Sequence, residues 1–278
     1  MILKDMIINA NNMKVEPFKD SRGHSGESGQ LYIYTAPDGK KYLVKTKPLD
    51  VANEYISHQI AKIIGVPTSE AVLIKENGKL SVGIEYEDDF QRANMNDFYG
   101  TEKYASDDIP ICVGGRCIKP VEVTEAKYAD DDPLLAEAMS YLAFRYLVAM
   151  EDNIQVAFAH GHLISFDYAY AFNLTEEAFD GIMCGNEMLF KNAVRNFNNY
   201  LFILHGYKSS LELLRRPNTD RLLDAYFDPI LDFYNTDFSE LFAELRQVFP
   251  RTVVNYYATC FQIINRQIAG IIDDDKKE

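Results

Sequence analysis

The sequence lacks long hydrophobic runs, and this bears on where the protein acts. Its longest apolar stretches, such as AFRYLVAM at residues 143–150, are far shorter than the ~20 residues that a membrane-spanning helix needs. The start of the chain also lacks the charged-then-apolar order of a secretory signal peptide. We therefore expect a cytoplasmic protein with no membrane partner.

Basic charge is also in short supply. The chain has 28 Lys and Arg against 42 Asp and Glu, which gives a formal net charge of −14 and a pI near 4.8. Because contacts to nucleic-acid phosphates need a basic surface, this balance argues against direct nucleic-acid binding. An acidic protein can still bind a nucleotide through Mg²⁺.

Cysteine is scarce, with four residues spread as Cys112, Cys117, Cys184 and Cys260. The segment CVGGRC could be half of a zinc knuckle, but no second Cys or His pair stands at a matching spacing. The alternative is a hairpin turn at residues 113–116, with two thiols facing each other in a reducing compartment. Internal repeats and low-complexity linkers are absent from the sequence as well.

What the chain does have is enough apolar material for a substantial core. It has 278 residues, of which 47% are hydrophobic and 13% aromatic. That length accommodates two lobes or two domains.

The segment from residue 134 to 172 holds the most informative pattern. Apolar residues at three- and four-residue spacing over 134–147 predict a largely buried helix, followed by the polar cluster Glu151-Asp152-Asn153. Two alternating runs around His160-Gly161 then predict a hairpin, which carries Asp167 among aromatic neighbours. Since an unpaired carboxylate is costly to desolvate, we expect a cation, a metal or an Arg against Asp167.

Upstream, a Gly- and Ser-rich stretch leads into a predicted pair of strands. Residues 20–36 read DSRGHSGESGQLYIYTA, and PDGKKYLVK follows as the hairpin partner. Glycines in such a loop let backbone amides approach phosphate oxygens. Lys45 stands at the end of the second strand among apolar neighbours, where it could reach phosphates or could instead be a surface lysine.

A helix over residues 53–64 follows, ended by Gly65 with Pro67 beyond it. Glu54 is expected in its first turn, either as a carboxylate that favours the helix dipole or as an ion-pair partner of Lys45. We expect His58 to face solvent. Residues 72–86 then predict a hairpin with its turn at 76–78.

As an ordered set, these pieces resemble the HipA-like kinases, bacterial serine/threonine protein kinases of toxin–antitoxin type that are themselves similar to phosphatidylinositol kinases. The resemblance covers roughly residues 20–172. Its pieces are SRGHSGESG, LVK, NEYISHQIAKIIGVPTSEAVLI, GIEYEDDF, LAFRYLVAMED and GHLISFDYAYAF. It implies an α+β, two-lobed protein-kinase-like fold, with a small antiparallel-sheet N-lobe and a mostly helical C-lobe.

The resemblance also implies an ATP-dependent phosphotransferase that uses Mg²⁺ and transfers the γ-phosphate to a protein hydroxyl. Asp152 would be the catalytic base, and Asn153 and Asp167 would hold the metal. The nucleotide would be bound by the loop, the strand lysine with its helix carboxylate, and the hinge: Gly23, Ser25, Gly26, Ser28, Gly29, Lys45, Glu54, Glu85, Tyr86 and Glu87. The family's regulatory autophosphorylation serine would fall on Ser21, Ser25 or Ser28.

One departure from the family concerns the catalytic loop. The family has its metal-binding Asn five positions after the catalytic Asp, where this chain has Ala157. The loop is about four residues short, so either Asp152 and Asn153 do both jobs from adjacent positions or the site is degenerate. A pseudokinase, or a nucleotide-binding interaction module without transfer activity, is therefore the alternative. A protein substrate or an antitoxin-like partner is expected.

We expect three regions in the chain. Residues 1–88 would form the N-lobe, residues 89–133 the hinge with an insertion rich in turn residues, and residues 134–278 the helical C-lobe. Aromatic residues of the last region, such as Tyr256, Tyr257 and Phe261, stand at core spacing.

Overall fold

The structure is a computed structural model, and it describes residues 7–18, 31–86, 90–93, 102–104, 111–113, 116–118, 121–123, 132–150, 155–159, 161–201, 203 and 220–275. Three of the segments singled out above lie outside the described residues. They are the Gly- and Ser-rich loop, Glu87 with the rest of 87–89, and residues 151–154, which include Asp152 and Asn153.

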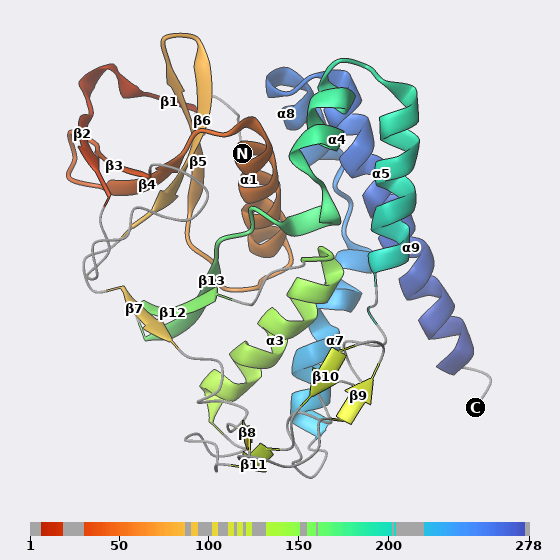
Figure 1. Ribbon diagram of the computed structural model, residues 1–278. Helices are drawn as coiled ribbons and strands as arrows, with labels where there is room; N and C mark the ends of the chain where they lie inside the picture. The colour runs from red at the N-terminus through yellow and green to blue at the C-terminus, as the bar shows by residue number, and fades with distance from the viewer. Residues whose placement is uncertain are drawn as a thin grey trace.

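The N-terminal half is built on a six-stranded sheet with the order β1-β5-β6-β4-β3-β2 (Figure 1). Its pairs are antiparallel except β1 with β5, which is parallel. The β5–β6 hairpin turns at Asn77 and Gly78, both at positive φ, which is the tight turn that Asn-Gly favours. The strands are β1 (Ile7–Asn9), β2 (Lys14–Pro17), β3 (Tyr32–Thr35), β4 (Lys41–Lys45), β5 (Ala71–Glu76) and β6 (Lys79–Glu85), with a short 3-10 helix η2 (Ala10–Asn12) after β1.

Helix α1 (Pro48–Ile63) packs on β5 and β6 of this sheet. It begins five residues earlier than predicted, because Pro48 occupies its first position, where a missing N–H costs nothing. It ends as predicted at Gly65, whose φ of +74° belongs to the left-handed region. The Val66 N–H donates to the Ala61 carbonyl at 2.8 Å and closes the helix end.

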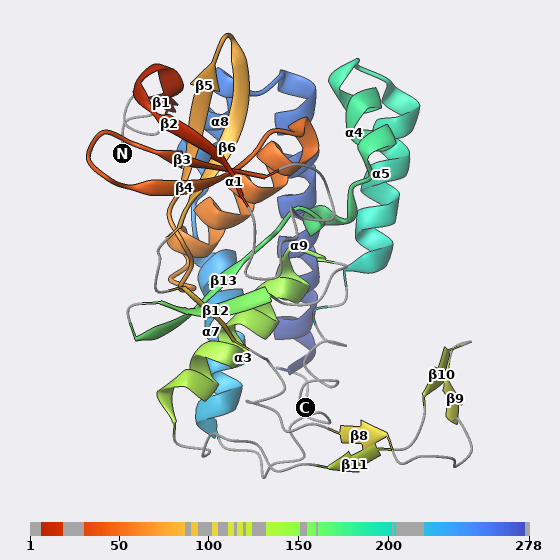
Figure 2. The same cartoon turned by 60° about the vertical axis from the view of Figure 1, so that its left-hand side comes forward.

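Below the sheet, a three-stranded sheet of order β13-β12-β7 lies against helix α3 (Figures 1 and 2). Helix α3 (Pro133–Leu147) is capped by the Asp132 side chain, which accepts from the Leu134 N–H at 2.9 Å. The hairpin of β12 (Gln155–Ala159) and β13 (His162–Phe166) stands where the sequence predicts it. The third strand, β7 (Gln91–Ala93), pairs with β12 and was not predicted.

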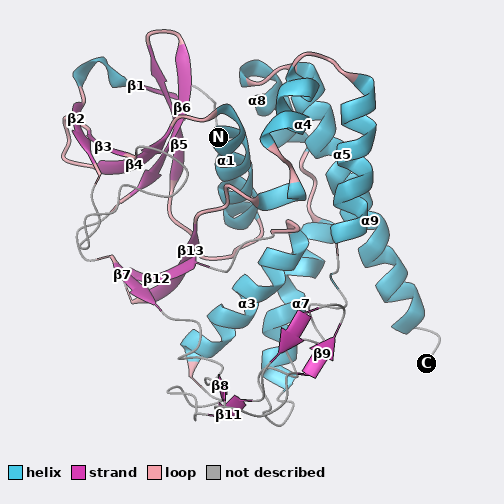
Figure 3. Cartoon of the chain, viewed as in Figure 1, coloured by secondary structure: helices cyan, strands magenta, loops and turns pink. Residues whose placement is uncertain are grey.

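The C-terminal half is helical, as Figure 3 shows. The long helix α9 contacts each of the helices α4, α5, α7 and α8, and its Tyr256 and Tyr257 are fully buried, so they have the packing role predicted for them. The remaining elements are η3 (Ala171–Asn173), α4 (Glu176–Met183), α5 (Glu187–Tyr200), α7 (Asp220–Asn235), α8 (Ser239–Val248) and α9 (Arg251–Asp275).

Besides β7, four short strands lie in the described part of the region predicted as hinge and insertion: β8 (Glu102–Tyr104), β9 (Ile111–Val113), β10 (Arg116–Ile118) and β11 (Val121–Val123). Strands β9 and β10 pair antiparallel with Cys112 opposite Cys117. This pairing agrees with the interpretation of CVGGRC as a hairpin. Within the described part of the chain, every helix is too short or too polar to cross a lipid bilayer.

Candidate functional site

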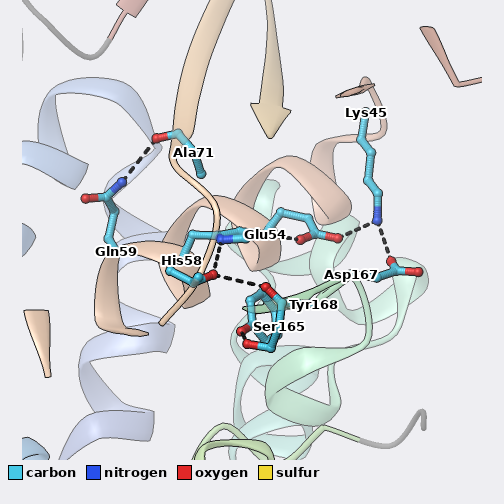
Figure 4. A network of polar contacts seen from close by, with 9 residues as sticks. Lys45, Glu54, His58, Gln59, Ala71, Ser165, Asp167 and Tyr168 are labelled. Carbon is cyan, nitrogen blue, oxygen red and sulfur yellow. Dashed lines mark hydrogen bonds and ion pairs between the residues drawn. The ribbon is translucent and has the colours of Figure 1, made fainter. Parts of the chain in front are cut away.

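Lys45 is the centre of the site. It ends strand β4, opposite Val82 of β6, and is only 5% exposed. Its ammonium group forms ion pairs with Glu54 of α1 and with Asp167 Oδ1, the latter at 2.5 Å (Figure 4). Burial alone would lower the pKa of Lys45, but the two carboxylates outweigh burial and raise it, so this lysine stays charged.

Glu54 fixes the lysine from the helix side. It is fully buried, and although burial would raise the pKa of its carboxyl group, Lys45 and His58 together outweigh that effect and hold the pKa at about 2. Because α1 begins at Pro48, Glu54 lies in the second turn. The hypothesis that Glu54 is a first-turn carboxylate that only favours the helix dipole is therefore wrong. The observed contact is the ion pair with Lys45.

Asp167 follows β13 directly and approaches Lys45 from the C-terminal half. Its side chain is 33% exposed, compared with 6% for Lys45, so part of the carboxylate remains accessible. Its φ is +66°, a left-handed conformation that non-glycine residues adopt infrequently and that concentrates at functional sites. The cation that the sequence required against Asp167 is Lys45.

A second polar chain connects α1 to β13. His58 Nε2 lies 3.5 Å from Glu54 Oε2, and His58 Nδ1 lies 2.6 Å from the Thr68 hydroxyl. Thr68 donates to the Ser165 carbonyl at 3.2 Å. The Ser165 hydroxyl hydrogen-bonds Tyr168, and both of these residues are labelled in Figure 4. His58 is 1% exposed, so the prediction that it faces solvent is wrong.

Asn53, the residue before Glu54, joins three parts of the fold. Its amide nitrogen donates to the carbonyls of Ala169 and Ala171 at 2.7 and 3.0 Å, and its oxygen accepts from Tyr257 of α9 at 2.7 Å. No role is predicted for Asn53 from the sequence. The available signal was spacing, because Asn53 with Ser57 and Glu54 with His58 are i, i+4 pairs that form a polar stripe beside the apolar positions of the helix.

The predicted hinge is described in part. The N–H groups of Glu85 and Tyr86 donate to the carbonyls of Glu70 and Lys41, both at 2.8 Å, and Glu85 also pairs with Lys40 at 3.1 Å. Any backbone N–H that binds adenine must therefore come from another residue. Glu87, the next hinge residue, lies outside the described residues, and the adenine-binding role of the hinge stays a prediction.

An aromatic row borders this hinge. Tyr86 packs against Phe18 and Phe90, with ring centroids 6.0 and 6.1 Å apart. Phe90 in turn packs on Phe166, the residue before Asp167, at 5.1 Å. The row thus connects the end of the six-stranded sheet to the hairpin that carries Asp167.

The described residues supply Asp167 as a candidate metal ligand, and a metal ion would need further ligands besides it. Among the described residues, no three His, Cys, Asp or Glu side chains converge closely enough to hold an ion. Asp167 supplies a partly exposed carboxylate, which is the oxygen ligand that Mg²⁺ prefers. The structure thus brings together Lys45, Glu54 and Asp167, whereas Asp152, Asn153 and the loop glycines and serines stay sequence predictions.

Comparison with solved structures finds a full-length match. The chain is similar to the crystal structure of the Helicobacter pylori proinflammatory kinase CtkA, with a TM-score of 0.54 and 11% sequence identity over 94% of this chain and 98% of that chain. A second, weaker match is HipA of Shewanella oneidensis MR-1, in a toxin–antitoxin complex with HipB and operator DNA. Its TM-score is 0.27 and its identity 10%, over 80% of this chain and 63% of that chain.

No family model and no curated protein matches the sequence. At 11% identity the similarity to CtkA shows the fold and nothing finer. The predicted two-lobed, kinase-like α+β fold is therefore confirmed. The boundaries proposed for the lobes at residues 88 and 133 stay predictions.

Proposed function

We propose that this protein is an ATP-dependent phosphotransferase that transfers the γ-phosphate to a serine or threonine hydroxyl of a protein. The observation that carries the proposal is the buried Lys45, held between Glu54 of α1 and Asp167 after β13. A strand lysine fixed by a helix carboxylate, beside a hairpin carboxylate, is the arrangement that kinases use for ATP phosphates and metal.

Each residue has a defined task in this proposal. Lys45 would bind phosphate oxygens, and Glu54 would keep its ammonium group in place. Asp167 would bind Mg²⁺, which when bound neutralises charge on the phosphates. Asp152 would accept the proton of the acceptor hydroxyl. The hydroxyl oxygen would form a bond to the γ-phosphorus, while the bond from the γ-phosphorus to the oxygen that bridges the β- and γ-phosphates breaks and ADP leaves. The backbone of the loop from Gly23 to Gly29 would cover the phosphates.

A second candidate, nucleotide binding without transfer, is favoured by the short catalytic loop. Helix α3 ends at Leu147 and β12 begins at Gln155, so only residues 148–154 connect them. Asp152→Asn separates the two candidates, since it should abolish transfer of radiolabelled phosphate and leave nucleotide binding intact. A wild-type protein that binds ATP but transfers no phosphate would favour the second candidate.

The resemblance extends the proposal to regulation. A phosphate on Ser21, Ser25 or Ser28 would add about −1.5 to −2 charges and repel the ATP phosphates. Mass spectrometry after incubation with ATP and Mg²⁺ should find this modification in the wild type, and its absence would count against it. An antitoxin-like protein partner is proposed on the resemblance alone.

Nucleotide-dependent thermal stabilisation tests the proposal. At 100 times its dissociation constant a ligand adds about 2.7 kcal/mol, which corresponds to roughly 5–10 °C in Tm for a chain of this size. Lys45→Ala should lose this shift, measured against its own baseline. Lys75→Ala is the matched control, because Lys75 is an exposed lysine on β5 of the same sheet. An unchanged shift in Lys45→Ala would contradict the proposed role of this lysine.

A further inference from the structure

A cavity of about 290 Å³ lies between the start of α1 and the segment that follows Asp167. The α1 side contributes Lys47 and Asp50, and the other side contributes Tyr170, Asn173 and Glu176. Its size is close to the lower end of small-molecule pockets, so it can accept a side chain or a similarly small group. None of these residues belongs to the set assigned to ATP or metal.

Asp50 is the unusual member of this lining. It is only 7% exposed, and within the described part of the chain its carboxylate has no hydrogen-bond or ion-pair partner. Burial is the main cause that raises the pKa of Asp50 to about 6, against the opposing influence of Lys45. A desolvated carboxylate in this state gains stability from any cation that reaches it.

The nearby cations are already engaged. Lys45 and Lys47 both lower the pKa of Asp50 by their charge, but Lys45 is bound to Glu54 and Asp167, and Lys47 is bound to Glu176 at 2.8 Å. Each lysine therefore has a carboxylate partner other than Asp50. Asp50 is thus the carboxylate of this lining that has no ion-pair partner among the described residues.

We propose that this cavity binds the guanidinium group of an arginine in the protein substrate, with Asp50 as its carboxylate partner. Arginine fits better than lysine because its planar group can bond a carboxylate through two N–H groups and stack on an aromatic ring. Tyr170, which is 52% exposed, supplies such a ring in the same lining. The inference rests on the proposed function and specifies the substrate: a basic segment, which also suits a chain with a net charge of −14.

Binding of paired peptides tests this inference. The probes are capped serine peptides with one arginine placed at each position from three before to three after the serine, and matching peptides with citrulline, which has the same shape and no charge. Affinities for the wild-type protein are measured by calorimetry with and without ATP and Mg²⁺. At one or more positions the arginine peptide should bind at least about tenfold more tightly than its citrulline counterpart.

Variants assign that preference to Asp50. Asp50→Asn should reduce the arginine preference to about one, and Asp50→Glu should retain part of it. Glu187→Gln is the matched control, because Glu187 is also a first-turn helix carboxylate but is exposed and lies outside the lining. It should keep the full preference, which excludes an effect of net charge alone.

The outcomes separate this inference from the proposed function. Equal affinity for arginine and citrulline peptides at every position in the wild type would overturn the inference, whether or not any variant folds. So would an undiminished preference in Asp50→Asn, or equal binding of free arginine amide and the best peptide, which would indicate a small-cation site. The nucleotide-dependent thermal shift reports on the proposed function independently of either result.

Discussion

Lys45 shows how the fold keeps a charge in its interior. Desolvating a lysine is costly, yet here two carboxylates from different parts of the chain surround the ammonium group. Breaking such a buried arrangement by removing one partner typically costs about 3–5 kcal/mol, because the remaining charge is left buried. The pair with Asp167 also means that phosphates bound by Lys45 would lie against the residue proposed to hold the metal.

The backbone conformation of Asp167 is the second unusual feature of the site. A left-handed backbone at an aspartate is tolerated but costs free energy, and here it coincides with the contact to Lys45. The sequence indicated that Asp167 needs a cation, since its neighbours are apolar. Whether this cation is a metal, an arginine or a lysine could not be predicted from the sequence, because it depends on which strand end packs against the hairpin.

Asp50 gives a prediction for the dependence of stability on pH. Its pKa is about 6 in the fold and near 3.8 when unperturbed. The folded state therefore retains a proton that the unfolded chain has released, and stability is lost as pH rises from about 4 to 6. Asp50→Asn removes this loss, so it should raise Tm relative to wild type at pH 7 and change it little at pH 4.

Thermal denaturation at both pH values, without nucleotide or Mg²⁺, checks this prediction. Glu187→Gln, which removes an exposed carboxylate, should show a much smaller difference between the two pH values. A Tm gain for Asp50→Asn that is the same at pH 4 and pH 7 would contradict the assigned pKa.

At the scale of elements, helix α1 connects the two halves of the molecule. One face packs on the six-stranded sheet, and its polar stripe of Asn53, Glu54, Ser57 and His58 is buried. Through Glu54 this helix sets the position of Lys45, and through Asn53 it holds the segment after Asp167. Movement of α1 would therefore disturb both Lys45 and the segment after Asp167.

Removing the Asn53 side chain tests this link. Asn53→Ala leaves two backbone carbonyls and the Tyr257 hydroxyl without the partner they have in the buried site. It should lower the free energy of unfolding by about 2–4 kcal/mol and weaken the nucleotide-dependent shift. Chemical denaturation measures the first effect and a thermal shift assay the second.

Asn198→Ala is the control, because Asn198 is an exposed asparagine on α5. Its stability should stay within about 0.5 kcal/mol of wild type. If Asn53→Ala proved as stable as this control, the account of Asn53 as a buried link would be wrong.

The elements also show what sequence could and could not predict. The Gly65 end of α1 and the Asn77-Gly78 turn follow from local backbone preferences, and both are where the sequence places them. The prediction that His58 faces solvent failed because polar residues on a helix usually mark its solvent face. Here the polar face of α1 is buried and includes Glu54, the partner of Lys45. Strand β7 was missed because three residues carry no clear alternation and acquire their pairing from the distant β12.

At the scale of the whole molecule, the site lies where the two halves meet. Lys45 and Glu54 come from the sheet and helix of the N-terminal half, and Asp167 comes from the hairpin beside α3 (Figures 1 and 4). The order of these parts along the chain allowed the fold to be predicted through its resemblance to a family. Their contact depends on the packing of residues more than 100 positions apart, which no local pattern determines.

Asp167→Asn tests the central claim, that Lys45 and Asp167 together bind a nucleotide with its metal. The change keeps the shape of the side chain but removes the charge that would bind Mg²⁺, so the part of the nucleotide shift that depends on Mg²⁺ should disappear. Asp180→Asn is the control, because Asp180 is an exposed aspartate on α4, and this variant should behave as wild type.

The measurement is the Tm of wild type, Asp167→Asn and Asp180→Asn with ATP alone and with ATP plus Mg²⁺, each relative to the same protein without ligand. We predict a larger shift with Mg²⁺ than without it for wild type and Asp180→Asn, and no difference between the two conditions for Asp167→Asn. A full Mg²⁺-dependent shift in Asp167→Asn would contradict the assignment of the metal to this residue, and with it most of the case for a kinase.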